Sequence, residues 1–100
     1  MPFQGNAFRF DVATLNTVNE VGAVYGLFTP TRLRPGFVDC LYVGQTNNLR
    51  TRLAEHYRNP PIAGITHFFA EPISTEWQRR TREIALIAEF NPPGNHTRGG

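Results

Sequence analysis

Arg52 and His56 place a permanent cation and a titratable imidazole four residues apart in a segment that is predicted to be helical. At about 100° per residue, both fall along one edge of the apolar stripe made by Leu49, Leu53 and Tyr57. This stripe must face a sheet, so we expect the two polar side chains at the boundary between sheet and solvent. Such a pair is either a snorkelling arginine beside a hydrogen-bonded histidine, or a phosphate-binding group beside a proton acceptor.

Two tyrosines on neighbouring predicted strands are the next candidates for chemistry. Tyr25 lies in the expected strand 21–28, and Tyr42 lies in the expected strand 37–45 on the same face as Cys40. The two phenols lie near each other if the strand register brings those faces together. A strand tyrosine usually packs in the core with its hydroxyl bonded to a partner, so neither tyrosine alone indicates a function.

Glu83 is the most unusual residue of a long helix that is predicted to end near Phe90. It shares a helix column with Leu86, Ile87 and Phe90, and a carboxylate in an apolar column is costly unless it is paired or binds a cation. The main buried face of the same helix is predicted to comprise Trp77, Thr81, Ile84 and Ala88.

Two interpretations of Glu83 remain open at this point. The first is an ion pair on the helix itself, with Arg79 or Arg80 as the partner. The second is a metal ligand, because a single carboxylate that leaves most of the coordination shell to water and phosphate suits Mg²⁺.

The elements that must position these residues follow the order strand, strand, helix, strand, helix. The first two strands form an antiparallel hairpin around the proline-containing loop 29–36, and the third strand is 65–73. This order predicts an α+β fold, an α/β sandwich with a small, three-stranded, mostly antiparallel sheet flanked by helices. Residues 1–20 are expected to be an N-terminal arm or an extra strand, and residues 96–100 a flexible tail.

Capping residues mark where the two helices begin. Thr46 or Asn47 is the expected N-cap of the first helix. In the second helix, Thr75 and Gln78 have the spacing of a capping box.

The bulk composition is that of one small globular domain of 100 residues with a net charge of +2. No apolar run approaches the roughly 20 residues that span a bilayer, so no membrane association is expected. Cys40 is the single cysteine and cannot form an internal disulfide, which favours a cytoplasmic or nucleoid-associated protein. All ten basic residues are arginines, which suits paired contacts to phosphate oxygens, although a GC-rich genome produces the same bias.

Taken together in chain order, these residues resemble the GIY-YIG nuclease domain over roughly residues 21 to 95. The first signature strand lacks its usual glycine, which is Ala23 here, and Val24 and Val43 replace isoleucines. The matching residues are Ala23-Val24-Tyr25, Tyr42-Val43-Gly44, Arg52, Glu83 and Asn95. His56 is similar to the histidine found in the restriction-enzyme branch of the family.

The resemblance implies a metal-dependent endonuclease that hydrolyses DNA phosphodiester bonds to 5′-phosphate and 3′-hydroxyl ends. It implies that Glu83 holds one Mg²⁺ or Mn²⁺ ion per site and that Arg52 contacts the scissile phosphate. Asn95 is expected to tie the end of the chain to the site.

Three side chains are candidates for activating the water. Tyr25 or Tyr42 contacts it, and one of them is a general base if its pKa, ordinarily about 10, is lowered by the ion and by Arg52. His56 is the other proton acceptor, either directly or through a tyrosine hydroxyl.

DNA is therefore the expected partner. Because no recognisable helix-turn-helix, zinc finger or basic arm is present, specificity requires a homodimer, a partner protein or a structured substrate such as a flap or branch. The alternative is a catalytically inactive nucleic-acid-binding module on the same scaffold. In both cases, the expected contacts to the nucleic-acid backbone are Arg32, Arg34, Arg50 and Arg58.

Overall fold

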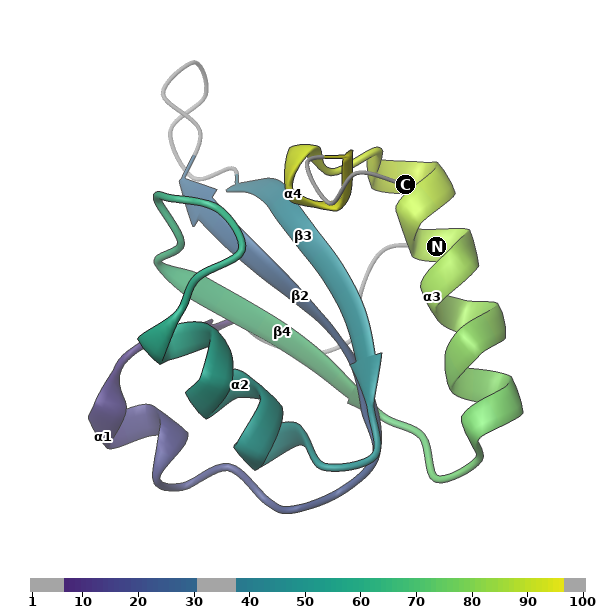
Figure 1. The fold of residues 1–100 in the computed structure, drawn as a ribbon, viewed down its shortest axis with the longest axis horizontal. Coiled ribbons are helices and arrows are strands. Elements are labelled where there is room, and N and C mark those ends of the chain that lie inside the picture. The colour runs from purple at the N-terminus through teal and green to yellow at the C-terminus, as the bar shows by residue number, and fades with distance from the viewer. Residues whose placement is uncertain (1–6, 31–37, 97–100) are drawn as a thin grey trace.

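The computed structural model describes residues 7–30 and 38–96, and these ranges form four strands and four helices (Figure 1). In chain order, the elements are β1 (Phe8–Arg9), α1 (Val12–Leu15), β2 (Ala23–Pro30), β3 (Val38–Thr46), α2 (Leu49–Arg58), β4 (His67–Pro72), α3 (Glu76–Phe90) and α4 (Pro93–His96). No helix within the described ranges is long and apolar enough to cross a membrane.

The sheet has the strand order β1-β4-β2-β3, with every neighbouring pair antiparallel. The expected fold class, an antiparallel sheet flanked by helices, is confirmed, but the sheet has four strands and not three. The additional strand is β1, which pairs Phe8 with Phe68 and Arg9 with His67 at the outer edge of β4. An extra strand within residues 1–20 was one of the two alternatives expected from the sequence, and the pairing shows where it lies.

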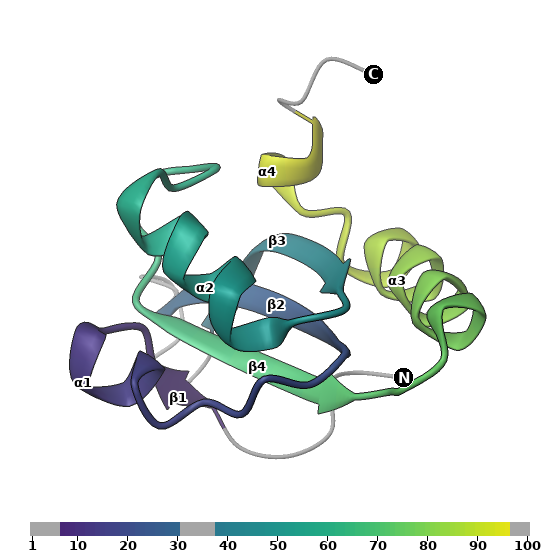
Figure 2. The same cartoon turned by 60° about the horizontal axis from the view of Figure 1, so that its bottom comes forward.

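The two faces of the sheet carry separate cores because side chains alternate along β2 and β3. Tyr25 and Leu27 face α1 and α2, where they pack with Leu53. Val24 and Phe28 face the opposite side, where Leu86 of α3 covers them. Figure 2 shows α2 lying over one face of the sheet and α3 running beside β3. A side chain that reaches past β3 can therefore approach the α2 side from α3.

A bulge in the β2–β3 hairpin changes which residues of β3 share a face. Leu27 pairs with Tyr42 and Phe28 pairs with Cys40, so Leu41 is an extra residue. The prediction that Cys40 lies on the face of Tyr42 is therefore wrong, and Cys40 packs with Phe28 on the α3 side. Burial raises the pKa of the Cys40 thiol to about 12, so it is a packing residue and not a reactive one.

The start of α2 differs from the predicted caps, whereas the N-cap of α3 is the predicted Thr75. Asn48, and not Thr46 or Asn47, caps α2, and its Oδ1 accepts a hydrogen bond of 3.1 Å from Thr51 N. Thr75 is the N-cap of α3, but its side chain makes no capping hydrogen bond, so the predicted capping box is absent.

The entry to α3 is held by a buried arginine instead. Arg79 Nη1 donates to the carbonyls of Ile73 and Ser74 at 2.9 and 2.8 Å. This guanidinium fixes the connection from β4 to α3 without help from the capping residue.

The predicted buried face of α3 is also wrong. Trp77 and Ile84 are 72% and 67% exposed, whereas Leu86 is fully buried. The helix packs against the sheet through the column that contains Leu86, Ile87 and Phe90. This column includes Glu83. Compared with the predicted orientation, α3 is therefore rotated about its axis, so that the Glu83 carboxylate lies on the packed side and the stripe with Trp77 and Ile84 faces solvent.

Substitutions on the two faces of α3 test this rotation. We expect Leu86→Ala to lower the free energy of unfolding by about 2–5 kcal/mol, because it opens a cavity in a closed core. The matched substitution Ile84→Ala should change it by less than about 0.5 kcal/mol, because that side chain is already in water. Chemical denaturation measures both, and the reverse order would show that the face is assigned incorrectly.

Candidate active site

The hairpin brings the two signature tyrosines together beneath α2. Tyr25 pairs with Gly44 and Leu27 pairs with Tyr42, so both phenols lie on the same face of the sheet. Their ring centroids are 6.3 Å apart and both side chains are buried. The register thus meets the condition under which the two phenols were expected to lie near each other.

Gly44 creates the space for the Tyr25 hydroxyl. A Cβ at this position would lie 2.5 Å from the hydroxyl oxygen and 2.7 Å from Cζ of the ring. The ring of Tyr25 therefore crosses the backbone of the neighbouring strand, which only glycine permits here. The requirement is for a close approach and not for an unusual backbone conformation.

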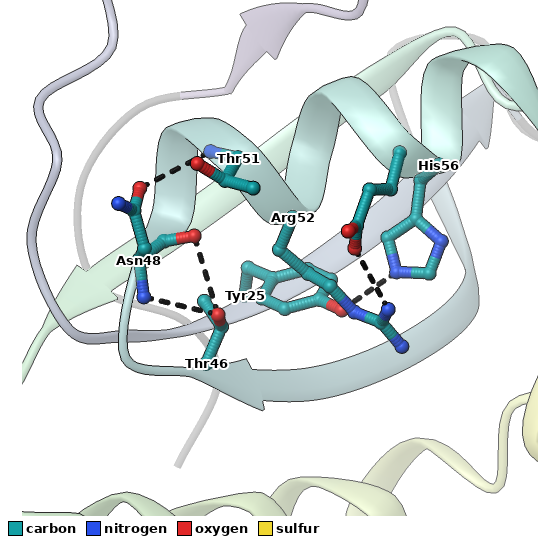
Figure 3. Close-up of polar contacts among 7 residues, drawn as sticks. Tyr25, Thr46, Asn48, Thr51, Arg52 and His56 are labelled. Carbon is teal, nitrogen blue, oxygen red and sulfur yellow. Dashed lines mark hydrogen bonds and ion pairs between the residues drawn. The ribbon is translucent and has the colours of Figure 1, made fainter.

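His56 joins the phenols from above. Its Nε2 and the Tyr25 hydroxyl share a hydrogen bond of 2.7 Å, in which the hydroxyl donates when Nε2 carries no proton (Figure 3). The imidazole centroid is 5.2 Å from that of Tyr42. His56 is only 6% exposed, so it belongs to the buried stripe and not to the boundary with solvent that was predicted. Tyr57, expected in that stripe, is exposed and rests against Phe10.

Arg52 lies at the mouth of this cluster. Its Nη1 donates to Glu55 Oε1 at 3.0 Å, and its guanidinium extends beside the Tyr25 hydroxyl (Figure 3). The pKa of Arg52 is raised, first by the bond to Glu55, so its positive charge is permanent. A cavity of about 570 Å³ opens here, lined by Tyr42, Arg52, Glu55, His56, Arg58, Asn59 and Pro61.

The electrostatics keep the Tyr25 hydroxyl protonated. Its pKa lies well above the ordinary value near 10, chiefly because burial disfavours the phenolate, and the neighbouring Tyr42 adds to this. Arg52 acts in the opposite direction without reversing the shift. In the protein by itself, Tyr25 is therefore a hydrogen-bonded, neutral group and not the phenolate base that a lowered pKa would give.

Glu83 is partly buried on the packed side of α3, and its charge also raises the pKa of Tyr25. This coupling places its carboxylate within electrostatic reach of the phenols. Arg79 bonds to Gln45, Ile73 and Ser74, while Arg80 pairs with Glu76 at 2.9 Å. These contacts disfavour the interpretation that Glu83 pairs with one of the two arginines.

The donor set around Glu83 is compatible with one kind of metal site. Within residues 7–30 and 38–96, no three histidine, cysteine, aspartate or glutamate side chains form a group that could hold an ion. The expected site is of a different type, in which one carboxylate is completed by water and phosphate oxygens. A partly buried carboxylate whose charge acts on the Tyr25 hydroxyl is compatible with that description.

Asn95 uses both ends of its amide on the edge strand. Its Oδ1 accepts from Val43 N and its Nδ2 donates to Val43 O, each at 2.9 Å. The preceding Gly94 lies so close to β3 that a Cβ would meet the Leu41 carbonyl at 2.5 Å. The end of the chain is thus tied to the strand that carries Tyr42.

The four predicted backbone-contact arginines fall into two groups. Arg50 and Arg58 are exposed on α2, and Arg58 also lines the large cavity. Arg32 and Arg34 lie outside the described residues.

Three contributors to the site were missed from the sequence. Glu55 lies three residues after Arg52, and this i,i+3 spacing on a helix would have predicted the ion pair from the sequence. The steric role of Gly44 depends on the hairpin register. The burial of Arg79 depends on which side of α3 faces the sheet, and no sequence pattern indicated that side.

The comparisons with known proteins agree with this fold. The chain matches the magnesium-bound GIY-YIG N-terminal endonuclease domain of UvrC from Thermotoga maritima, with a TM-score of 0.63 and 19% identity over 82% of this chain and 91% of the other. Two point mutants of that domain match equally in TM-score. One replaces a tyrosine by phenylalanine (18% identity) and one an asparagine by alanine (19%); each match covers 82% of this chain and 90% of the other, and both mutants are bound to the catalytic divalent cation.

No family model and no curated protein matches the sequence. The structural likeness therefore shows the fold, which is that of the GIY-YIG endonuclease domain. The resemblance proposed from the motif residues is confirmed at this level.

The raised pKa of Tyr25 predicts how the fold responds to alkali. The neutral phenol contributes stability that is fully present below pH about 10, where the unfolded tyrosine ionises, and is lost as the pH rises through the higher folded pKa. Denaturation at increasing pH should show this decline in the wild type and a shallower one in Tyr25→Phe. An equal decline in both proteins would contradict the assignment.

Proposed function

We propose that this protein is a metal-dependent endonuclease that hydrolyses DNA phosphodiester bonds, leaving 5′-phosphate and 3′-hydroxyl ends. The observation that carries the proposal is the buried hydrogen bond between the Tyr25 hydroxyl and His56 Nε2, because His56 and the neighbouring Arg52 both line an open cavity. A hydrogen-bonded hydroxyl alone would also suit a tyrosine that only packs in the core. The position of its imidazole partner beside a cation at a cavity is what favours chemistry.

The proton relay follows from the protonation state of Tyr25. The neutral hydroxyl donates its proton to Nε2 of His56 while its oxygen accepts a proton from the attacking water. The water thereby becomes a hydroxide-like nucleophile, the tyrosine returns to its neutral form, and the imidazole becomes a cation. This relay avoids a phenolate, which burial disfavours.

Arg52 supplies charge at the phosphate. In the protein alone it is bonded to Glu55, and both side chains are partly exposed, so this ion pair is weak enough to be exchanged. A phosphate oxygen takes the place of the Glu55 carboxylate, and the permanent cation then offsets the charge that develops in the transition state.

Glu83 is the residue that would hold Mg²⁺ or Mn²⁺. When bound, such an ion neutralises charge on the phosphate oxygens and on the departing 3′ oxygen. Asn95 and Gly44 position the strands and touch no reacting atom in this scheme. Selection of a DNA sequence is assigned to a second copy of the chain or to a partner protein.

Replacement of the metal ligand separates cutting from binding. We expect Glu83→Gln to reduce Mg²⁺-dependent plasmid nicking by at least about 100-fold while duplex affinity stays within about threefold, because the cationic surface is unchanged. The control Glu89→Gln, on the exposed side of the same helix, should nick normally. If Glu83→Gln nicks at the wild-type rate, the assignment of Glu83 as the metal ligand is wrong. If the wild-type protein does not nick DNA at all, a module that only binds nucleic acid is favoured.

Replacement of the imidazole tests the relay. His56→Gln retains a hydrogen-bonding side chain but cannot take up a proton at neutral pH, so we expect a slower rate and a flat pH–rate profile near neutrality. The control His67→Gln alters a histidine on β4 that is bonded to Thr66 and should leave the profile unchanged. If His56→Gln keeps the wild-type profile, His56 is a packing residue.

A further inference from the structure

A second polar cavity shares Arg52 with the candidate active site. It has a volume of about 340 Å³ and lies where the end of β3 meets the start of α3. Its lining consists of Gln45, Thr46, Asn47, Arg52, Glu76 and Arg79. Because Arg52 lines both cavities, the second cavity adjoins the first.

Arg79 gives this cavity a cation with no acidic partner. The side chain is 5% exposed, and its hydrogen bonds go to neutral oxygens of Gln45, Ile73 and Ser74. In the part of the chain that the structure describes, no carboxylate forms an ion pair with it. A buried guanidinium without a counter-charge is costly, and an arriving anion lowers that cost.

The rest of the lining also favours an anion. α3 begins at this cavity, and its N-cap Thr75 makes no side-chain bond to the first turn, so the positive end of the helix is not satisfied from within by that residue. Glu76 is the one acidic residue in the lining, and its Oε2 pairs with Arg80 Nε at 2.9 Å. Asn47 is exposed and offers an amide at the entrance.

We propose that this cavity binds a second phosphate of the DNA backbone, the one next to the scissile linkage, with Arg79 as its principal contact. The inference rests on the proposed function and deepens it. Arg52 touches the scissile phosphate and borders its neighbour, so the strand enters the site in a defined direction. Arg79 has two roles. Its guanidinium bonds to the carbonyls of Ile73 and Ser74 and so holds the connection from β4 to α3, and its positive charge binds the phosphate.

The salt dependence of DNA binding tests the proposal without any cleavage. Affinity for a short fluorescent duplex is measured in EDTA over a series of KCl concentrations. Each lost phosphate contact lowers the slope of log affinity against log salt by about 0.9. We expect this loss, with about a 10-fold weaker affinity, for Arg79→Gln but not for Arg79→Lys. Arg9→Gln, which removes one charge at the opposite edge of the sheet, is the matched control.

A second variant leaves the structural bonds of Arg79 in place. Asn47→Asp adds a negative charge at the entrance of the cavity and should weaken binding several-fold, whereas Asn19→Asp, on the loop before β2, should not. If both Arg79→Gln and Asn47→Asp keep the slope and affinity of their controls while the wild type binds and nicks DNA, the cavity holds no phosphate and only this inference fails. If the wild type neither binds nor nicks DNA, the proposed function fails with it.

Discussion

The hydrogen bond between the Tyr25 hydroxyl and His56 Nε2 is the interaction on which the site depends. It joins a central strand to the helix above it, and both groups are buried, so neither has bulk water as an alternative partner. The bond fixes the side of α2 that faces the sheet and thereby sets where Arg52, one turn earlier, emerges. The proposed chemistry at the cavity therefore relies on a bond that also links β2 to α2.

Two close backbone approaches keep this bond in place. Gly44 lets the phenol cross the neighbouring strand, and Gly94 lets the end of the chain lie against β3. Asn95 then satisfies both backbone groups of Val43 at an edge strand that would otherwise present them unpaired. The signature residues outside the reacting groups thus act through geometry. This division explains why the motif combines phenols and charges with glycines and an amide.

The sequence predicted the antiparallel sheet and the two longer helices, because strand alternation and helix periodicity are local properties. It left the meeting of the two phenols dependent on the strand register. It failed at Cys40, where a single bulged residue reverses the alternation. It also failed on α3, where Trp77 and Ile84 form the more regular apolar stripe but face solvent. A helix amphipathic on two sides does not reveal which side meets the sheet, and the burial of Arg79 depends on that choice. The roles of Arg52, His56 and Glu83 remain predictions.

In the proposed reaction, the Tyr25 hydroxyl carries a proton from the attacking water to His56. The most direct measurement is Mg²⁺-dependent plasmid nicking by Tyr25→Phe, which removes one oxygen atom and keeps the ring, with Tyr57→Phe as the exposed control. We expect Tyr25→Phe to nick at a rate at least about 100-fold below wild type with duplex affinity unchanged. Wild-type nicking by Tyr25→Phe would contradict it, because no hydroxyl would then stand between the water and the imidazole.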